Sequence, residues 1–237
     1  MKNYPRILVA YPTADKKDYC LDEFTDQIRT FTYPAYDTFC VDNSEDPSHV
    51  EKLWERGIPA IHEPINGDFR EELARHQNII RDYFLKGKWD YLMMIESDVF
   101  TGEAILDKFV AYAEASKASI VTGTYEINRE GGTLCLTSTI DARGVRTEKM
   151  LGRTHGYDVM GQGVVPLRKL LNDPDGRITA TGIGCTLFSR EVLEEIPFRV
   201  DLKLNKRAFS DTYYFTDAAK AGHEILIDSD LICHHEK

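Results

Sequence analysis

A continuous apolar run at 91–95 (Tyr-Leu-Met-Met-Ile) ends directly at the acidic tripeptide Glu96-Ser97-Asp98. A strand that is apolar at every position is typical of a central strand in a sheet that is covered by helices on both faces. Ligands bind at the carboxyl ends of such strands, because the flanking helices leave a crevice there. The run therefore predicts an α/β protein with a polar site at residues 96–98.

Short apolar runs alternate with longer amphipathic stretches along the first half of the chain. This alternation predicts an α/β fold with a central mixed, mostly parallel sheet. The expected strands lie at 6–11, 38–41, 58–62, 91–95 and 119–122, and the expected helices at 21–30, 48–56, 69–85 and 102–115. We expect the first strand to stop at Pro12, since proline lacks the backbone N–H of a strand residue.

The pattern is less regular between residues 125 and 179, where only 133–140 is strand-like. Order returns with a strand at 182–188, helices at 190–195 and 212–221, a strand at 225–227 and an apolar run at 231–235. No internal repeat is visible. The 237 residues fit a single domain.

Charge and cysteine usage restrict the class of protein. The chain has 29 basic and 39 acidic side chains and a net charge of −10, which argues against binding a nucleic-acid backbone. Its five cysteines are scattered and form no CxxC pair, as expected for reduced thiols in the cytoplasm. No apolar stretch approaches the ~20 residues that span a bilayer. We therefore expect a soluble cytoplasmic protein. The sequence leaves open whether it forms a homo-oligomer.

Three polar groups are candidates for chemistry. Glu96 and Asp98 can share a divalent cation, because Mg²⁺ and Mn²⁺ prefer oxygen ligands; the alternative is two acids that cap the next helix. His234-His235 offers imidazole, which suits Mn²⁺, although a tandem histidine is also a common surface feature. Asp211, at a predicted helix start, could accept a proton from a hydroxyl or serve in a helix N-cap.

Taken in order, these elements resemble the GT-A-fold glycosyltransferases, in particular family-2-like enzymes that use nucleotide sugars. The resemblance extends from about residue 7 to residue 235. It implies a nucleotide-sugar-binding half at about 1–124 and an acceptor-binding half at about 125–237 of one catalytic domain. On the donor side it implies roles for the first strand's end at Pro12, for Asp42 as the contact to the base, and for Arg75 and Asn78 of an Arg-x-x-Asn helix.

The resemblance also implies the metal ligands and the catalytic base. Residues 96–98 take the place of the family's Asp-x-Asp motif, so Glu96, Ser97 and Asp98 are expected at the donor, with Asp98 the better ligand because the first position is Glu here. His235, not His234, takes the family's remaining metal-ligand position. Asp211 stands at the base position.

On the acceptor side, Ser210 replaces the first acid of the pair that opens the family's catalytic helix. The glycines Gly182 and Gly184 would let a sugar approach the backbone. His155 is a further candidate, because it falls where such enzymes carry an acceptor loop.

The function implied is transfer of a sugar from a nucleotide-diphosphate sugar to an acceptor hydroxyl, dependent on Mn²⁺ or Mg²⁺ and with inversion. The acceptor could be a glycan, a protein or a small molecule, and retaining chemistry stays open. The alternatives are a nucleotidyltransferase, a non-catalytic nucleotide-sugar-binding scaffold subunit, and a transferase acting on modified nucleic acid. Residues 12–17 lack the Gly-rich, Lys-containing loop of a nucleotidyltransferase, and the net charge disfavours nucleic acid.

Overall fold

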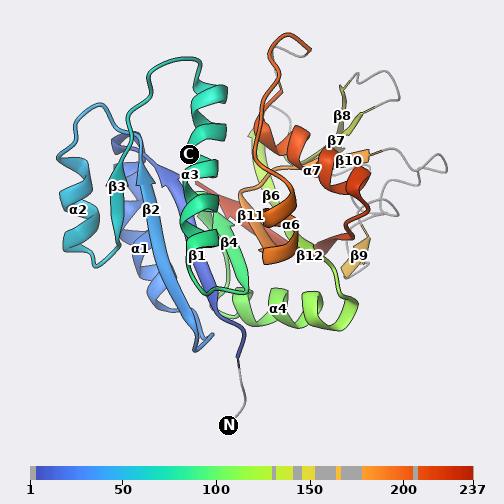
Figure 1. The fold of residues 1–237 in the computed structure, drawn as a ribbon, viewed down its shortest axis with the longest axis horizontal. Coiled ribbons are helices and arrows are strands. Elements are labelled where there is room, and N and C mark those ends of the chain that lie inside the picture. Colours follow the sequence, from blue (N-terminus) through green and yellow to red (C-terminus); the bar gives the residue numbers. More distant parts are fainter. Residues whose placement is uncertain are drawn as a thin grey trace.

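The computed structural model describes residues 4–129, 132–140, 146–152, 164–166, 178–204 and 208–236. Its first half is a parallel sheet with the strand order β3 (Ala60–His62), β2 (Tyr36–Asp42), β1 (Ile7–Thr13) and β4 (Tyr91–Ile95) (Figure 1). β11 (Cys185–Ser189) pairs antiparallel with β4 and joins this half to β6 (Ile120–Arg129). The predicted α/β class and its mixed sheet are confirmed.

The remaining strands extend the sheet from β6. β12 (Ile225–His235) runs parallel to β6 and also pairs with the short strands β5 (Val99–Phe100) and β9 (Val164–Pro166). β7 (Gly132–Ile140) pairs with β6, β8 (Arg146–Gly152) and β10 (Ile178–Thr181), in each case antiparallel.

Helices cover both faces of the parallel strands (Figure 1). One face packs on α1 (Leu21–Arg29), α2 (His49–Glu55) and α4 (Ile105–Ser116). The other packs on α3 (Phe69–Lys86), α6 (Arg190–Glu195) and α7 (Ser210–Ala221). A 3-10 helix, η1 (Asp15–Cys20), connects β1 to α1.

The apolar run at 91–95 is the centre of this arrangement. Alternate residues of a strand point to opposite faces, and here Met93 and Ile95 belong to one half of the core while Leu92 and Met94 belong to the other. Each side chain of this kind stabilises the fold by about 1.5–3 kcal/mol when it is fully buried. The prediction of a doubly covered strand is therefore confirmed, and the strand delivers residues 96–98 to the edge of the sheet.

Three details differ from the sequence-based expectations. β1 continues through Pro12 to Thr13, because beyond Ala10 it pairs with β2 alone and proline is tolerated where a strand has one neighbour. The runs at 225–227 and 231–235 form one strand, β12, with a register irregularity between Asp228 and Ile232. The less regular segment contains β8, β9 and β10: β8 forms a hairpin with the preceding strand β7, whereas β9 pairs with β12 and β10 returns to pair with β7.

No helix in the described ranges is both long and apolar enough to cross a membrane. Cys20, Cys40, Cys185 and Cys233 are buried free thiols.

Candidate active site

The acidic tripeptide forms the turn between β4 and β5. The backbone N–H of Glu96 donates to Gly184 O at 3.0 Å, and the N–H of Val99 donates back to Glu96 O at 2.9 Å. The side chain of Asp98 is only 4% exposed. Since α4 begins at Ile105, these acids do not cap a helix, and that alternative is wrong.

The C-terminal strand brings an imidazole to the same turn. His235 pairs with Val99 across β12 and β5, and its Nε2 lies 3.1 Å from Asp98 Oδ2. The neighbouring N–H of Glu236 donates to Asp98 O at 2.8 Å. Strand alternation turns His234 the other way, where its side chain is 61% exposed and contacts the Glu236 carboxylate at 2.8 Å. The tandem histidine thus places a single imidazole at the site.

Glu96, Asp98 and His235 together form a candidate metal centre. Each offers one ligand atom, and these atoms all lie within 4.8 Å of one another. Two carboxylates and an imidazole are ligands that Mn²⁺ accepts and Mg²⁺ tolerates, and three protein ligands leave coordination positions for the oxygens of a bound anion. The donor set therefore fits the divalent cation predicted from the sequence.

The titration of the cluster reflects concentrated negative charge. Burial, and then the charge of Asp98, raise the pKa of Glu96 to about 7, with His235 opposing and Asp211 adding to the rise. Burial alone would raise the pKa of Asp98, but the hydrogen bonds with His235 and Lys17 outweigh burial and lower it. The hydrogen bond to Asp98 raises the pKa of His235 against the effect of its burial. A cation in this position would relieve the repulsion between the two carboxylates.

Lys17 is a site residue that the sequence reasoning missed. Its ammonium forms an ion pair with Asp98 Oδ2, from η1 directly after β1. The charged stretch Asp15-Lys16-Lys17-Asp18 at the end of the first predicted strand was the available signal. Its distance of 81 residues from Asp98 along the chain concealed the contact.

The predicted base, Asp211, lies in the first turn of α7. Its Oδ1 accepts hydrogen bonds from Thr212 N at 2.5 Å and from Thr212 Oγ1 at 3.2 Å. Ser210 Oγ donates to Gln77 Oε1 at 2.5 Å in a buried contact, which fixes the start of α7 to α3. The N-cap position is Phe209, without a side-chain cap, so neither residue of the Ser-Asp pair is the N-cap.

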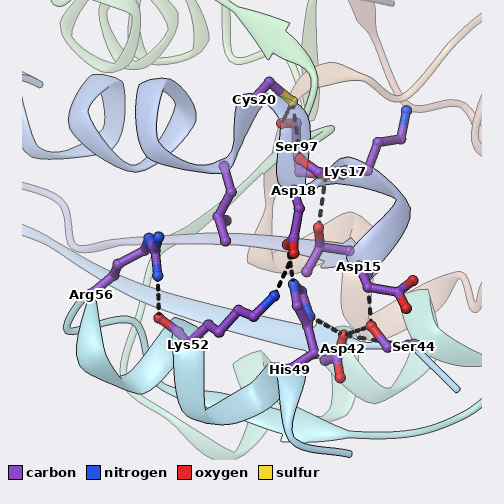
Figure 2. A network of polar contacts seen from close by, with 12 residues as sticks. Asp15, Lys17, Asp18, Cys20, Asp42, Ser44, His49, Lys52, Arg56 and Ser97 are labelled. Atoms are coloured by element: carbon purple, nitrogen blue, oxygen red, sulfur yellow. Dashed lines mark hydrogen bonds and ion pairs between the residues drawn. The ribbon is translucent and has the colours of Figure 1, made fainter. Parts of the chain in front are cut away.

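Asp42, at the carboxyl end of β2, is fully buried and surrounded by hydrogen-bonding partners (Figure 2). Its Oδ1 accepts from Ser44 Oγ at 2.6 Å and lies 2.7 Å from His49 Nδ1, and its Oδ2 lies 3.0 Å from His62 Nδ1. The other ring nitrogen of His49, Nε2, lies 2.8 Å from Asp18 Oδ1. Asp42 therefore organises this end of the sheet.

Replacing Asp42 by alanine is expected to lower the free energy of unfolding by about 3–5 kcal/mol, because it leaves His49 and His62 without their buried carboxylate. Urea unfolding followed by circular dichroism measures the loss. The matched control is Asp26→Ala, whose carboxylate is 74% exposed in a surface pair with Arg29 and whose loss is expected to cost about 0.5 kcal/mol or less. Equal losses in the two variants would contradict the central role of Asp42.

The two residues of the Arg-x-x-Asn motif hold neighbouring segments. The Arg75 guanidinium donates to Glu63 Oε2 at 2.7 Å and to Pro64 O at 3.1 Å, which secures the loop between β3 and α3. The Asn78 amide makes two bonds with the backbone of Phe198, at 2.7 and 2.9 Å, and so ties α3 to the segment after α6.

The other predicted donor residues lie at the carboxyl ends of β1 and β4. Thr13 Oγ1 donates to Ser97 Oγ at 2.9 Å. This bond joins the carboxyl ends of β1 and β4 at the edge that also carries Asp98, and Pro12 directly precedes Thr13 in β1.

Of the predicted acceptor residues, Gly182 and Gly184 are buried immediately before β11. The carbonyl of Gly184 supports the acidic turn through its bond from Glu96 N. His155 lies outside the described residues.

No protein-family model and no curated protein matches the sequence. Solved structures do match. The mannosyltransferase PcManGT of Pyrobaculum calidifontis, in complex with GDP-Man and Mn²⁺, aligns with a TM-score of 0.63 and 14% identity, over 98% of this chain and 57% of PcManGT. The 1–349 fragment of S. aureus TarS aligns with a TM-score of 0.61 and 15% identity, over 98% of this chain and 60% of that fragment. This chain thus spans somewhat more than half the length of PcManGT and of the TarS fragment, and 37% of the longer S. aureus TarS chain.

At these identities the likeness establishes the fold and not the activity. It extends over 98% of the chain. The chain therefore has the fold of the GT-A glycosyltransferases.

Proposed function

We propose that this protein is a metal-dependent glycosyltransferase that moves a sugar from a nucleoside-diphosphate sugar to an acceptor hydroxyl. The observation that carries the proposal is the convergence of Glu96, Asp98 and His235 within 4.8 Å at the carboxyl edge of the sheet. Ligands of open α/β sheets bind at the carboxyl ends of the strands, and a divalent cation held there would neutralise the charge of a diphosphate.

Asp98, His235 and Glu96 would hold Mn²⁺ or Mg²⁺, which supplies Lewis-acid stabilisation to the diphosphate leaving group. The Mn²⁺ and GDP-Man bound to PcManGT support this assignment. Ser97 and Pro12 would line the same edge of the donor site.

At the base-binding end, Asp42 would act through its neighbours, because its two oxygens already face Ser44, His49 and His62. The partly exposed His62 would contact the base. Arg75 would keep the loop before α3 closed around it.

On the acceptor side, Asp211 would take the proton of the attacking hydroxyl. The acceptor oxygen then bonds to the anomeric carbon as the bond from that carbon to the diphosphate oxygen breaks, and the nucleoside diphosphate departs. In-line attack of this kind inverts the configuration. The negative charge of Asp211 adds to the rise in the pKa of Glu96, after burial and the charge of Asp98.

Thermal unfolding against nucleoside diphosphates and nucleotide sugars, with and without Mn²⁺, tests the donor site. We expect one nucleotide, at a hundredfold excess over its Kd, to stabilise the protein by about 2.7 kcal/mol, or to raise Tm by about 5–10 °C, only when Mn²⁺ is present. Binding without turnover or donor hydrolysis over a broad acceptor panel would favour a scaffold subunit. No shift with any nucleotide would contradict the proposal.

A further inference from the structure

Lys17 lies where its positive charge competes for the metal centre. Its Nζ contacts Asp98 Oδ2, the same oxygen that lies 3.1 Å from His235 Nε2. The Asp98 side chain is 4% exposed and that of Lys17 is 38% exposed, so the pair joins a buried carboxylate to a cation that can reach solvent.

A divalent cation and the Lys17 ammonium would compete for one oxygen. A metal ligated through Asp98 Oδ2 would need a lone pair that now faces Nζ, and a cation ligated through either oxygen would lie close to the ammonium, where two positive charges repel. Because Lys17 is a flexible side chain with a compact charge, it can leave by rotation about its four-carbon stem.

The backbone on either side of Lys17 is held by hydrogen bonds. Displacement of the Lys17 ammonium from Asp98 would therefore need only a rotation of the side chain. Asp15 N donates to Ser44 Oγ at 2.8 Å, and Lys17 N donates to Ala14 O at 2.8 Å. Asp18 is fixed to His49 and to Lys52 of α2 (Figure 2). η1 is therefore tied to the end of β2 and to α2.

We propose that Lys17 is a built-in counter-cation: it neutralises Asp98 in the metal-free protein, opposes metal binding there, and is displaced towards the diphosphate when the metal binds. The inference rests on the proposed function, because it needs the metal centre. Beyond that function, Lys17 has opposite effects on two ligands. Lys17 weakens binding of the metal alone and strengthens binding of the metal–diphosphate pair.

The test is a calorimetric titration with Mn²⁺ alone, on wild type, Lys17→Ala and Lys16→Ala. Lys16 is exposed and adjacent, so its replacement removes the same formal charge without touching Asp98. We expect Lys17→Ala to bind Mn²⁺ about fivefold to tenfold more tightly than wild type, which is the loss of one competing ion pair. Lys16→Ala should stay within about twofold, since screening weakens distant surface charges.

A second titration adds GDP or UDP, whichever nucleoside diphosphate binds, at saturating Mn²⁺. Here Lys17→Ala should bind the nucleotide about fivefold more weakly than wild type, because the displaced cation is missing from the phosphates. This reversal of sign separates a counter-cation from a residue that merely supports the fold. Lys17→Met keeps the apolar stem and takes the place of the alanine variant if that variant fails to fold.

Two outcomes distinguish a failure of the counter-cation role from a failure of the proposed metal centre. If wild type binds Mn²⁺ and Lys17→Ala binds it equally or more weakly, the counter-cation role is wrong while the metal centre stands. If none of the variants binds Mn²⁺, with or without nucleotide, both the metal centre and the role of Lys17 are wrong.

Discussion

Replacing Asp98 by alanine should abolish Mn²⁺-dependent nucleotide binding and reduce sugar transfer by about 10³-fold, because it removes the most buried ligand of the proposed metal. Asp98 also holds Lys17 and His235 in place. Its loss therefore removes both the negative charge that attracts a cation and the contact that orients the imidazole. Initial rates over a range of Mn²⁺ concentrations, together with a direct Mn²⁺ titration, measure the effect.

Two comparisons make this result specific. Asp98→Asn keeps the shape of the side chain and should lose metal affinity as fully as the alanine variant, since an amide lacks the negative charge. Asp82→Ala removes a carboxylate that is 60% exposed on α3 and should leave the rate within about twofold. Retention of Mn²⁺-dependent activity by Asp98→Asn would exclude Asp98 as the principal ligand.

Replacing Asp211 by asparagine should lower kcat by about 10²–10⁴-fold, the usual contribution of a general base, while the donor Kd changes little. The amide preserves the shape and cannot take a proton. Thr212 holds Oδ1 of Asp211 at 2.5 and 3.2 Å from its N and Oγ1, so the variant should keep the position of the side chain. Steady-state kinetics with a defined acceptor, and donor titration of the same variant, separate the chemical step from binding.

The control for this experiment lies on the same helix. Asp217 is ion-paired with Arg199 at 2.6 Å, and Asp217→Asn makes the same chemical change further along α7, at a carboxylate that already has a partner. We expect its kcat to stay within about twofold of wild type. The anomeric configuration of the product, read by NMR, gives an independent check. Retained configuration, or an unchanged kcat in Asp211→Asn, would exclude Asp211 as the base of an inverting transfer.

The amino-acid pattern was enough to predict the first half of the fold. The uninterrupted apolar run at 91–95 requires cover on both faces, and the helices that provide it, such as the one expected at 69–85, have boundaries close to those of α3. Between residues 125 and 179 the pattern predicted only the strand at 133–140. The other strands there, such as β8, exist because their backbone pairs with a partner strand, and such pairing leaves little trace in the order of side chains.

The residues of the candidate site also fall into those that the sequence could place and those that only the structure placed. The acidic turn could be placed from sequence, because it follows a recognisable strand. The resemblance to a family indicated His235, and the structure gives the reason: pairing with β5 turns this histidine towards Asp98 and its neighbour His234 away. For Asp42 the family resemblance implied a direct contact to a base, whereas in the structure both of its oxygens already have partners.

By itself, then, the sequence determined which strands are buried and which carboxylates stand at their ends, since both follow from local periodicity and polarity. Only the tertiary structure decided which side chains meet there. Lys17 and His235 reach one oxygen of Asp98 from positions 81 and 137 residues away along the chain. Contacts at that separation depend on strand order and register, which backbone hydrogen bonds and the packing of the whole sheet fix together.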